Sequence, residues 1–142
     1  MNREIYQHDN DIDVTHKINT IELDNWINHL EYISKEMSNL LRMSDMDFNE
    51  KFEDDILFKK LQKKEIENNT LLKALKKYAG SRMNIAECDD TQCDMVYINE
   101  HETYRRSYLY HLDKYRKLKD EFFTTIQGKF TSSKIDSINS GI

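Results

Sequence analysis

A regular row of tyrosine and histidine residues in the last third of the chain is the feature best suited to chemistry. Its members follow one another at alternating spacings of four and three, which places them along one face of a helix. They are Tyr97, His101, Tyr104, Tyr108, His111 and Tyr115. The same face continues through Leu118 and Phe122, which are ordinary packing residues. The row therefore predicts either an aromatic packing seam with bonded polar ends or a site that handles a ligand, electrons or protons.

Metal binding by these histidines finds little support in their spacing. A dimetal centre in a helical bundle needs Glu-x-x-His pairs, because that spacing puts both ligands on one helical face. The residue three positions before His101 is Ile98. His101 and Glu102 open the zinc-protease pattern H-E-x-x-H, but Arg105 stands where the second histidine is needed. We therefore expect no metal and no cofactor.

Two cysteines, Cys88 and Cys93, precede this row. They could chelate zinc together with His101 or nearby carboxylates, but a structural zinc site normally takes four ligands and no second Cys or His pair follows. The first residues lack the apolar run of a secretory signal, and no stretch approaches the roughly 20 apolar residues of a membrane span. We therefore expect a cytoplasmic protein without a membrane span, in which both cysteines are reduced thiols.

Patterns for catalysis and for nucleic-acid binding are weak. The three glycines are scattered, so the chain has neither a glycine-rich phosphate loop nor a G-x-S-x-G elbow. Lysines between residues 59 and 77 form a positive stripe at helical spacing, without interleaved aromatic residues for base stacking. The net charge is −5, with −9 in residues 1–56 and +6 in residues 57–86. We expect the stripe to pair with the acidic first part, and we expect neither an enzyme nor a nucleic-acid-binding protein.

The elements that must position these residues are three long helices. The chain has no proline and only three glycines, and a third of its residues are charged, which favours uninterrupted helices. Capping residues and apolar periodicity predict helices over residues 19–43, 47–79 and 91–127. A single bent helix over residues 20–79 is the alternative, because no glycine or proline enforces the break. The first helix carries a heptad seam made of Leu23, Trp26, Leu30, Ile33, Met37 and Leu40.

The second predicted helix has a weak middle. It carries Phe48 and Phe52 near its start and ends near Gly80, which can adopt the left-handed backbone of a C-terminal cap. Between residues 63 and 70 the only apolar side chain is Ile66. We expect that stretch to be thinly buried or locally mobile.

Together these patterns predict an all-α protein of one small domain. Three helices pack as an up-down-up, antiparallel, coiled-coil-like bundle over residues 19–128, between a flexible N-terminal tail (1–18) and a polar C-terminal tail (129–142). Seams and charge stripes without a catalytic constellation favour an interaction or scaffold protein, which binds a protein partner or forms a homo-oligomer. The alternative is a small-molecule or metal-binding bundle that uses the Tyr and His row.

Overall fold

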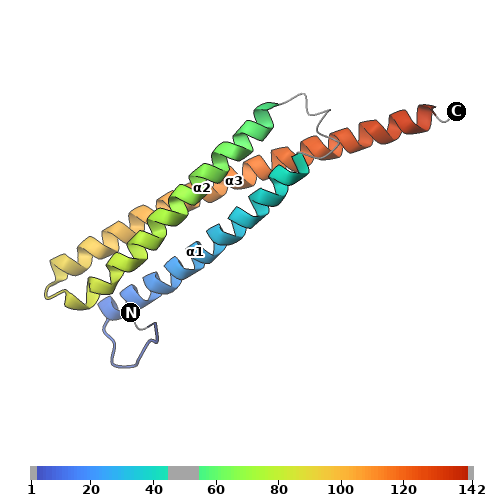
Figure 1. Ribbon diagram of the computed structural model, residues 1–142. Coiled ribbons are helices and arrows are strands. Elements are labelled where there is room, and N and C mark those ends of the chain that lie inside the picture. Colours follow the sequence, from blue (N-terminus) through green and yellow to red (C-terminus); the bar gives the residue numbers. More distant parts are fainter. Residues whose placement is uncertain (1–2, 45–54, 141–142) are drawn as a thin grey trace.

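Three long helices make up most of the chain. The computed structural model describes residues 3–44 and 55–140, with side chains for residues 3–44 and 56–128. Helix α1 spans Asp11–Ser44, α2 spans Asp55–Ser81 and α3 spans Thr91–Ser140, and a short 3-10 helix, η2, spans Arg82–Glu87. The predicted all-α bundle is confirmed (Figure 1).

The helices lie side by side and alternate in direction (Figure 1). Ser34 of α1 contacts Asn69 of α2. Earlier in α1, Thr20 contacts Arg82, which follows α2 in the chain. The two helices are therefore antiparallel, which excludes a single bent helix through both of them. Helix α3 returns beside α1 in the same direction as α1 (Figure 1).

Helix α1 begins at Asp11, well before the predicted start at residue 19. Asn10 caps it, because its Oδ1 atom accepts a hydrogen bond from the Asp13 backbone N–H at 2.8 Å. The Asp13 carboxylate in turn accepts one from the Asn10 N–H at 3.2 Å. This reciprocal pair is a capping box with aspartate at the position usually held by Glu or Gln. The prediction of a tail over residues 1–18 is therefore wrong for its second half, which is helical.

The segment before α1 is docked on the helix through charged side chains. Lys17 Nζ lies 2.6 Å from Asp9 Oδ2 and donates to the Glu4 carbonyl oxygen at 2.7 Å. Arg3 forms an ion pair with Asp24. These contacts draw the described part of the segment back along the first turns of α1.

Two apolar clusters form the core of the described part of the chain. The predicted seam of α1 is buried along its whole length. Its first five residues join the larger cluster, to which α2 contributes Leu75 and Tyr78. The smaller cluster lies at the other end of the bundle and consists of Leu40, Leu57, Leu61, Leu118 and Phe122. Phe48 and Phe52, which we placed in the second helix, lie outside the described residues.

The weak middle of α2 is anchored by a polar residue. Ile66 is 66% exposed, in line with the thin burial predicted for this stretch. Asn68, however, is completely buried, and its Nδ2 atom donates to the Leu30 carbonyl oxygen at 3.0 Å. A buried side-chain amide thus replaces the apolar contact that the sequence lacks here.

The connection from α2 to α3 differs from prediction at its start and agrees at its end. Gly80 is part of α2, and no described residue has a positive φ angle, so the predicted left-handed cap is wrong. The chain continues into η2, where Arg82 and Ile85 are buried. Helix α3 begins at Thr91 as predicted, and Asp90 caps it, because the Asp90 Oδ1 accepts from the Cys93 N–H at 2.8 Å.

Helix α3 continues to Ser140, where we predicted a polar tail from residue 129 onward. Its last turns project beyond the ends of α1 and α2 (Figure 1). The positive stripe of α2 pairs with both neighbours: Lys76 with Glu31 of α1 at 3.1 Å, and Lys60 with Glu121 of α3 at 3.3 Å. Among the described residues no helix is both long and apolar enough to cross a membrane.

Candidate functional site

The six residues of the predicted Tyr and His row lie on α3 and share one face. His101, Tyr108, His111 and Tyr115 are at most 8% exposed, whereas Tyr97 and Tyr104 are half-buried. The Tyr104 ring stacks on the ring of Tyr78 with centroids 4.4 Å apart. The structure therefore brings the row together as a face packed against the other two helices.

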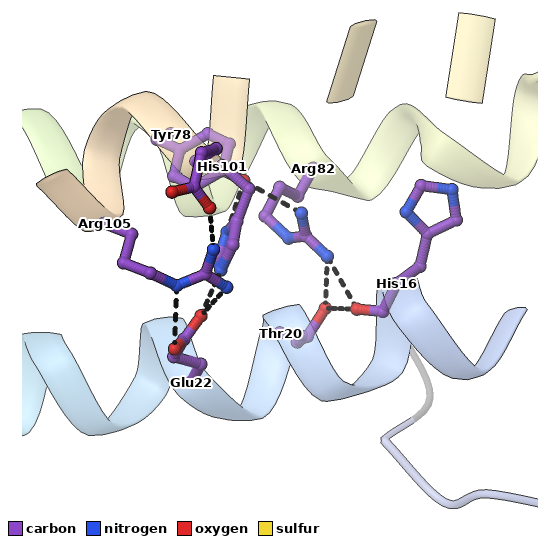
Figure 2. Close-up of polar contacts among 8 residues, drawn as sticks. His16, Thr20, Glu22, Tyr78, Arg82, His101 and Arg105 are labelled. Atoms are coloured by element: carbon purple, nitrogen blue, oxygen red, sulfur yellow. Dashed lines mark hydrogen bonds and ion pairs between the residues drawn. The ribbon is translucent and has the colours of Figure 1, made fainter. Parts of the chain in front are cut away.

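His101 lies at the centre of a buried chain of hydrogen bonds (Figure 2). Arg82 Nη1 lies 2.9 Å from the Tyr78 hydroxyl, which lies 2.8 Å from His101 Nδ1. His101 Nε2 lies 2.7 Å from Glu22 Oε1. A guanidinium can only donate and a carboxylate can only accept, so the direction is fixed. Tyr78 accepts from Arg82 and donates to His101, and His101 donates to Glu22.

The chain ends in an arginine on both sides. Arg105 Nη2 donates to Glu22 Oε1 at 2.6 Å (Figure 2). Arg105 also pairs with Glu102. Arginine does not release its proton in proteins. A Tyr, His and Glu series could in principle pass a proton, but here both ends are closed by groups that neither take up nor give one. The arrangement is thus suited to holding helices together rather than to proton transfer.

The charge states of this chain follow from burial and bonding. Burial lowers the pKa of His101 below its ordinary value, because the imidazolium loses its hydration. Burial also disfavours the Glu22 carboxylate, but the hydrogen bonds from Arg105 and His101 outweigh that effect and lower the pKa of Glu22. A neutral His101 donating to an ionised Glu22 agrees with the bond directions.

Arg82, in η2, bonds directly to α1 and to Tyr78 of α2 (Figure 2). Its Nη2 atom donates to the His16 carbonyl oxygen at 2.7 Å and to Thr20 Oγ1 at 2.8 Å, both in α1. His16 Nε2 lies 2.8 Å from Asp94 Oδ1, in the first turn of α3. This end of the bundle is therefore closed by polar contacts between elements far apart in sequence.

Three polar pairs form a ladder between α1 and α3. Each pair joins residues 79 positions apart, and successive pairs are seven residues apart on both helices. They are Glu22 with His101, His29 with Tyr108, and Glu36 with Tyr115. Trp26 fills the space between the first two rungs, and its ring stacks on His101 at 4.8 Å and on Tyr108 at 5.3 Å. We call these three pairs the polar ladder.

His111 points to α2 instead. Its Nε2 atom lies 2.8 Å from Asn68 Oδ1, so the imidazole N–H donates to the amide oxygen. Burial, with a smaller contribution from Lys64, lowers the pKa of His111 to about 4. The imidazole is therefore neutral near pH 7, in the tautomer that carries the proton on Nε2.

Cys88 and Cys93 are joined by a disulfide, with Cα atoms 5.5 Å apart. The prediction of two reduced thiols is wrong, because the turn between η2 and α3 brings the two residues within the usual bonding distance. Disulfide sulfurs are not thiolates and do not serve as the zinc ligands considered above. Among the described residues, no group of three or more His, Cys, Asp or Glu side chains is placed to hold a metal ion.

Several partners of the row were not predicted from the sequence, above all Glu22, Arg82 and Asn68. A usable signal existed for the polar ladder. Glu22, His29 and Glu36 repeat every seven residues beside the apolar seam of α1, just as His101, Tyr108 and Tyr115 repeat on α3. No comparable signal marks Arg82 or Asn68, since each is a single polar residue. Comparison of the chain with protein-family models, with curated proteins and with solved structures finds no match.

Proposed function

We propose that the protein is a non-catalytic interaction or scaffold protein, in which a rigid three-helix body presents the outer side of α3 to other protein. One contrast carries this proposal. On the inward face of α3, the buried tyrosine and histidine side chains are hydrogen-bonded within the chain, whereas the outward side leaves large apolar side chains 43–67% exposed. These outward residues are Met95, Val96, Leu109, Tyr110 and Phe123.

Buried polar bonds suit a scaffold because they are specific. A shift of α3 by one turn against α1 would separate the two members of every rung of the polar ladder, His101 from Glu22 included. Unpaired buried polar groups cost about 1 to 3 kcal/mol each, so such shifts are disfavoured. In other helical assemblies, buried polar residues fix register at some expense in stability. We assign the polar ladder that role here.

Exposed apolar side chains concentrated on one side of a helix are typical of protein-binding surfaces. The alternative, a small-molecule or metal-binding bundle, has less support. Four of its six proposed residues on α3 already bond to α1 or α2, and a ligand would have to break those bonds. They are His101, Tyr108, His111 and Tyr115. Nucleic acid remains a poorer candidate than protein, because lysines of the positive stripe pair with Glu31 and Glu121.

The cytoplasmic location expected from the sequence stays a prediction. The Cys88–Cys93 disulfide weighs against it, because structural disulfides persist mainly in oxidising compartments.

Site-specific photo-crosslinking tests the proposed interaction side. A photoreactive phenylalanine replaces Tyr110 on α3, and a matched control carries it in place of Ile66 on α2; the two native side chains are 67% and 66% exposed. We expect discrete protein adducts from position 110 and few from position 66. Equal labelling at both positions would count against a dedicated surface on α3.

A further inference from the structure

Five outward residues of α3 repeat every seven positions and form what we call the outer row. They are Met95, Glu102, Leu109, Arg116 and Phe123. Met95 and Phe123 are each 43% exposed and Leu109 is 53% exposed. The row spans about 42 Å of helix at 1.5 Å per residue.

The outer row stays on the same side of the bundle from one end to the other. The residues that directly precede four of its members are buried against α1 and α2, at 0–8% exposure. They are His101, Tyr108, Tyr115 and Phe122. Because these buried residues stay in contact over three heptads, α3 follows a seven-residue repeat relative to its neighbours. The outer row therefore runs along one side of the molecule instead of winding around it.

The chemistry of the outer row is symmetric about Leu109. Reading away from Leu109 in either direction, a charged residue comes first and an apolar residue second. The two charged residues, Glu102 and Arg116, have opposite signs. We propose that two copies of the chain pair through this row, with their α3 helices antiparallel around a two-fold axis at Leu109. This inference rests on the proposed interaction role and names a second copy as the partner.

An antiparallel pairing matches every position of the row. Leu109 meets Leu109 of the second copy, and Met95 meets its Phe123, so apolar side chains cover one another. Glu102 meets Arg116 of the second copy, twice by symmetry. A parallel pairing would instead set Glu102 against Glu102 and Arg116 against Arg116. Charge complementarity therefore selects the antiparallel arrangement.

Charges beside the row support the same arrangement. Arg106 and Asp113 follow Glu102 and Leu109 by four residues and flank the row on its outer side; their side chains are 79% and 60% exposed. The same two-fold axis brings Arg106 near Asp113 of the second copy. Arg116 makes no ion pair with any of the described residues, which leaves its guanidinium available to Glu102 of the second copy.

A charge swap tests both the pairing and its direction. Sedimentation equilibrium of the full chain should show a dimer at micromolar concentrations. Glu102→Arg should weaken dimerisation about tenfold or more, because it sets like charges against each other at two symmetric sites. Adding Arg116→Glu should restore the dissociation constant to about that of the wild type. In a parallel dimer the single change would merely exchange one like-charged pair for another, and no rescue would follow.

Two further variants separate this surface from general effects. Leu109→Glu should leave a monomer with unchanged helix content, whereas Ile66→Glu, at a more exposed apolar position of α2, should leave the dimer intact. Lys114→Glu, on the α2 side of α3, should also have no effect. A wild-type protein that stays monomeric at about 100 µM, or a double charge variant no better than the single one, would overturn the self-pairing. If a monomeric protein still crosslinks to another protein from position 110, the self-pairing fails while the proposed interaction role stands.

Discussion

The two ends of the bundle are joined by different forces. At the end near η2, Arg82, Tyr78 and His101 hold α1, α2 and α3 together through directed hydrogen bonds. At the other end, Leu118 and Phe122 continue the same face of α3 and pack in the smaller apolar cluster, beside Leu40, Leu57 and Leu61. Apolar contact is strong and indifferent to direction, whereas a hydrogen bond requires a particular partner. The comparison teaches that one face of a helix can stabilise the bundle by apolar packing at one end and fix the alignment of the helices by hydrogen bonds at the other.

The apolar end should suffer most from a single truncation. Phe122 is fully buried, so Phe122→Ala should cost about 3 to 5 kcal/mol in the free energy of unfolding, through lost burial and a cavity. Tyr32→Ala is the control, because Tyr32 is 63% exposed and should change stability by less than about 1 kcal/mol. Urea unfolding followed by circular dichroism measures both. A small loss for Phe122→Ala would mean that this end is loosely packed.

The buried hydrogen bond between His111 and Asn68 should make the effect of one substitution depend on the other. Taken alone, a buried imidazole suggests that His111→Leu is neutral or stabilising. In the structure the change leaves Asn68 Oδ1 without its donor, so we expect a loss of about 1 to 2 kcal/mol.

The same measurement with Asn68→Leu added completes a double-mutant cycle. The double variant should lose less than the sum of the two single losses, by about 1 kcal/mol, because no orphaned polar atom remains. His8→Leu, at a side chain that is 83% exposed, should have no effect. Additive losses would show that His111 and Asn68 are not coupled.

The two buried histidines of α3, His101 and His111, should make the stability of the protein sensitive to acid. His111 has a folded-state pKa of about 4, below its ordinary value of 6.5. Between these pH values the unfolded chain binds a proton that the folded protein does not, so stability is full above pH 6.5 and declines as the pH falls toward 4. The pKa of His101 is lowered in the same direction. Urea unfolding from pH 7.5 to 4.5 should show this decline, and the Asn68→Leu/His111→Leu variant should show a shallower one.

The smallest effect is expected for a substitution in the last turn of α2. Gly80 lies in α2 without a positive φ, and an added Cβ atom would meet nothing within 4 Å. Gly80→Ala should therefore raise the free energy of unfolding by about 0.5 to 1 kcal/mol, because alanine favours the helix and restricts the unfolded chain. A destabilised Gly80→Ala would indicate that residue 80 adopts the left-handed cap predicted from the sequence.

Much of the bundle could be read from the sequence. The seam of α1 from Leu23 to Leu40, the start of α3 at Thr91 and the buried face from His101 to Phe122 were all predicted. Each depends on contacts within one helix or on the periodicity of one helix, which the order of residues sets directly. The start of α1 at Asp11 was missed, although the capping pair of Asn10 and Asp13 is local and could have been recognised.

By itself, the sequence determined the helical content, the apolar seams and which face of α3 turns inward. Only the tertiary structure decided which residue each polar side chain of that face meets: Glu22 for His101, Asn68 for His111, and Arg82 for Tyr78. The physical reason is that the first set of features depends on residues close together in the chain and the second on residues far apart. Periodicity within a helix follows from backbone geometry, whereas a hydrogen bond between helices depends on their relative register, which the packing of all three helices sets together.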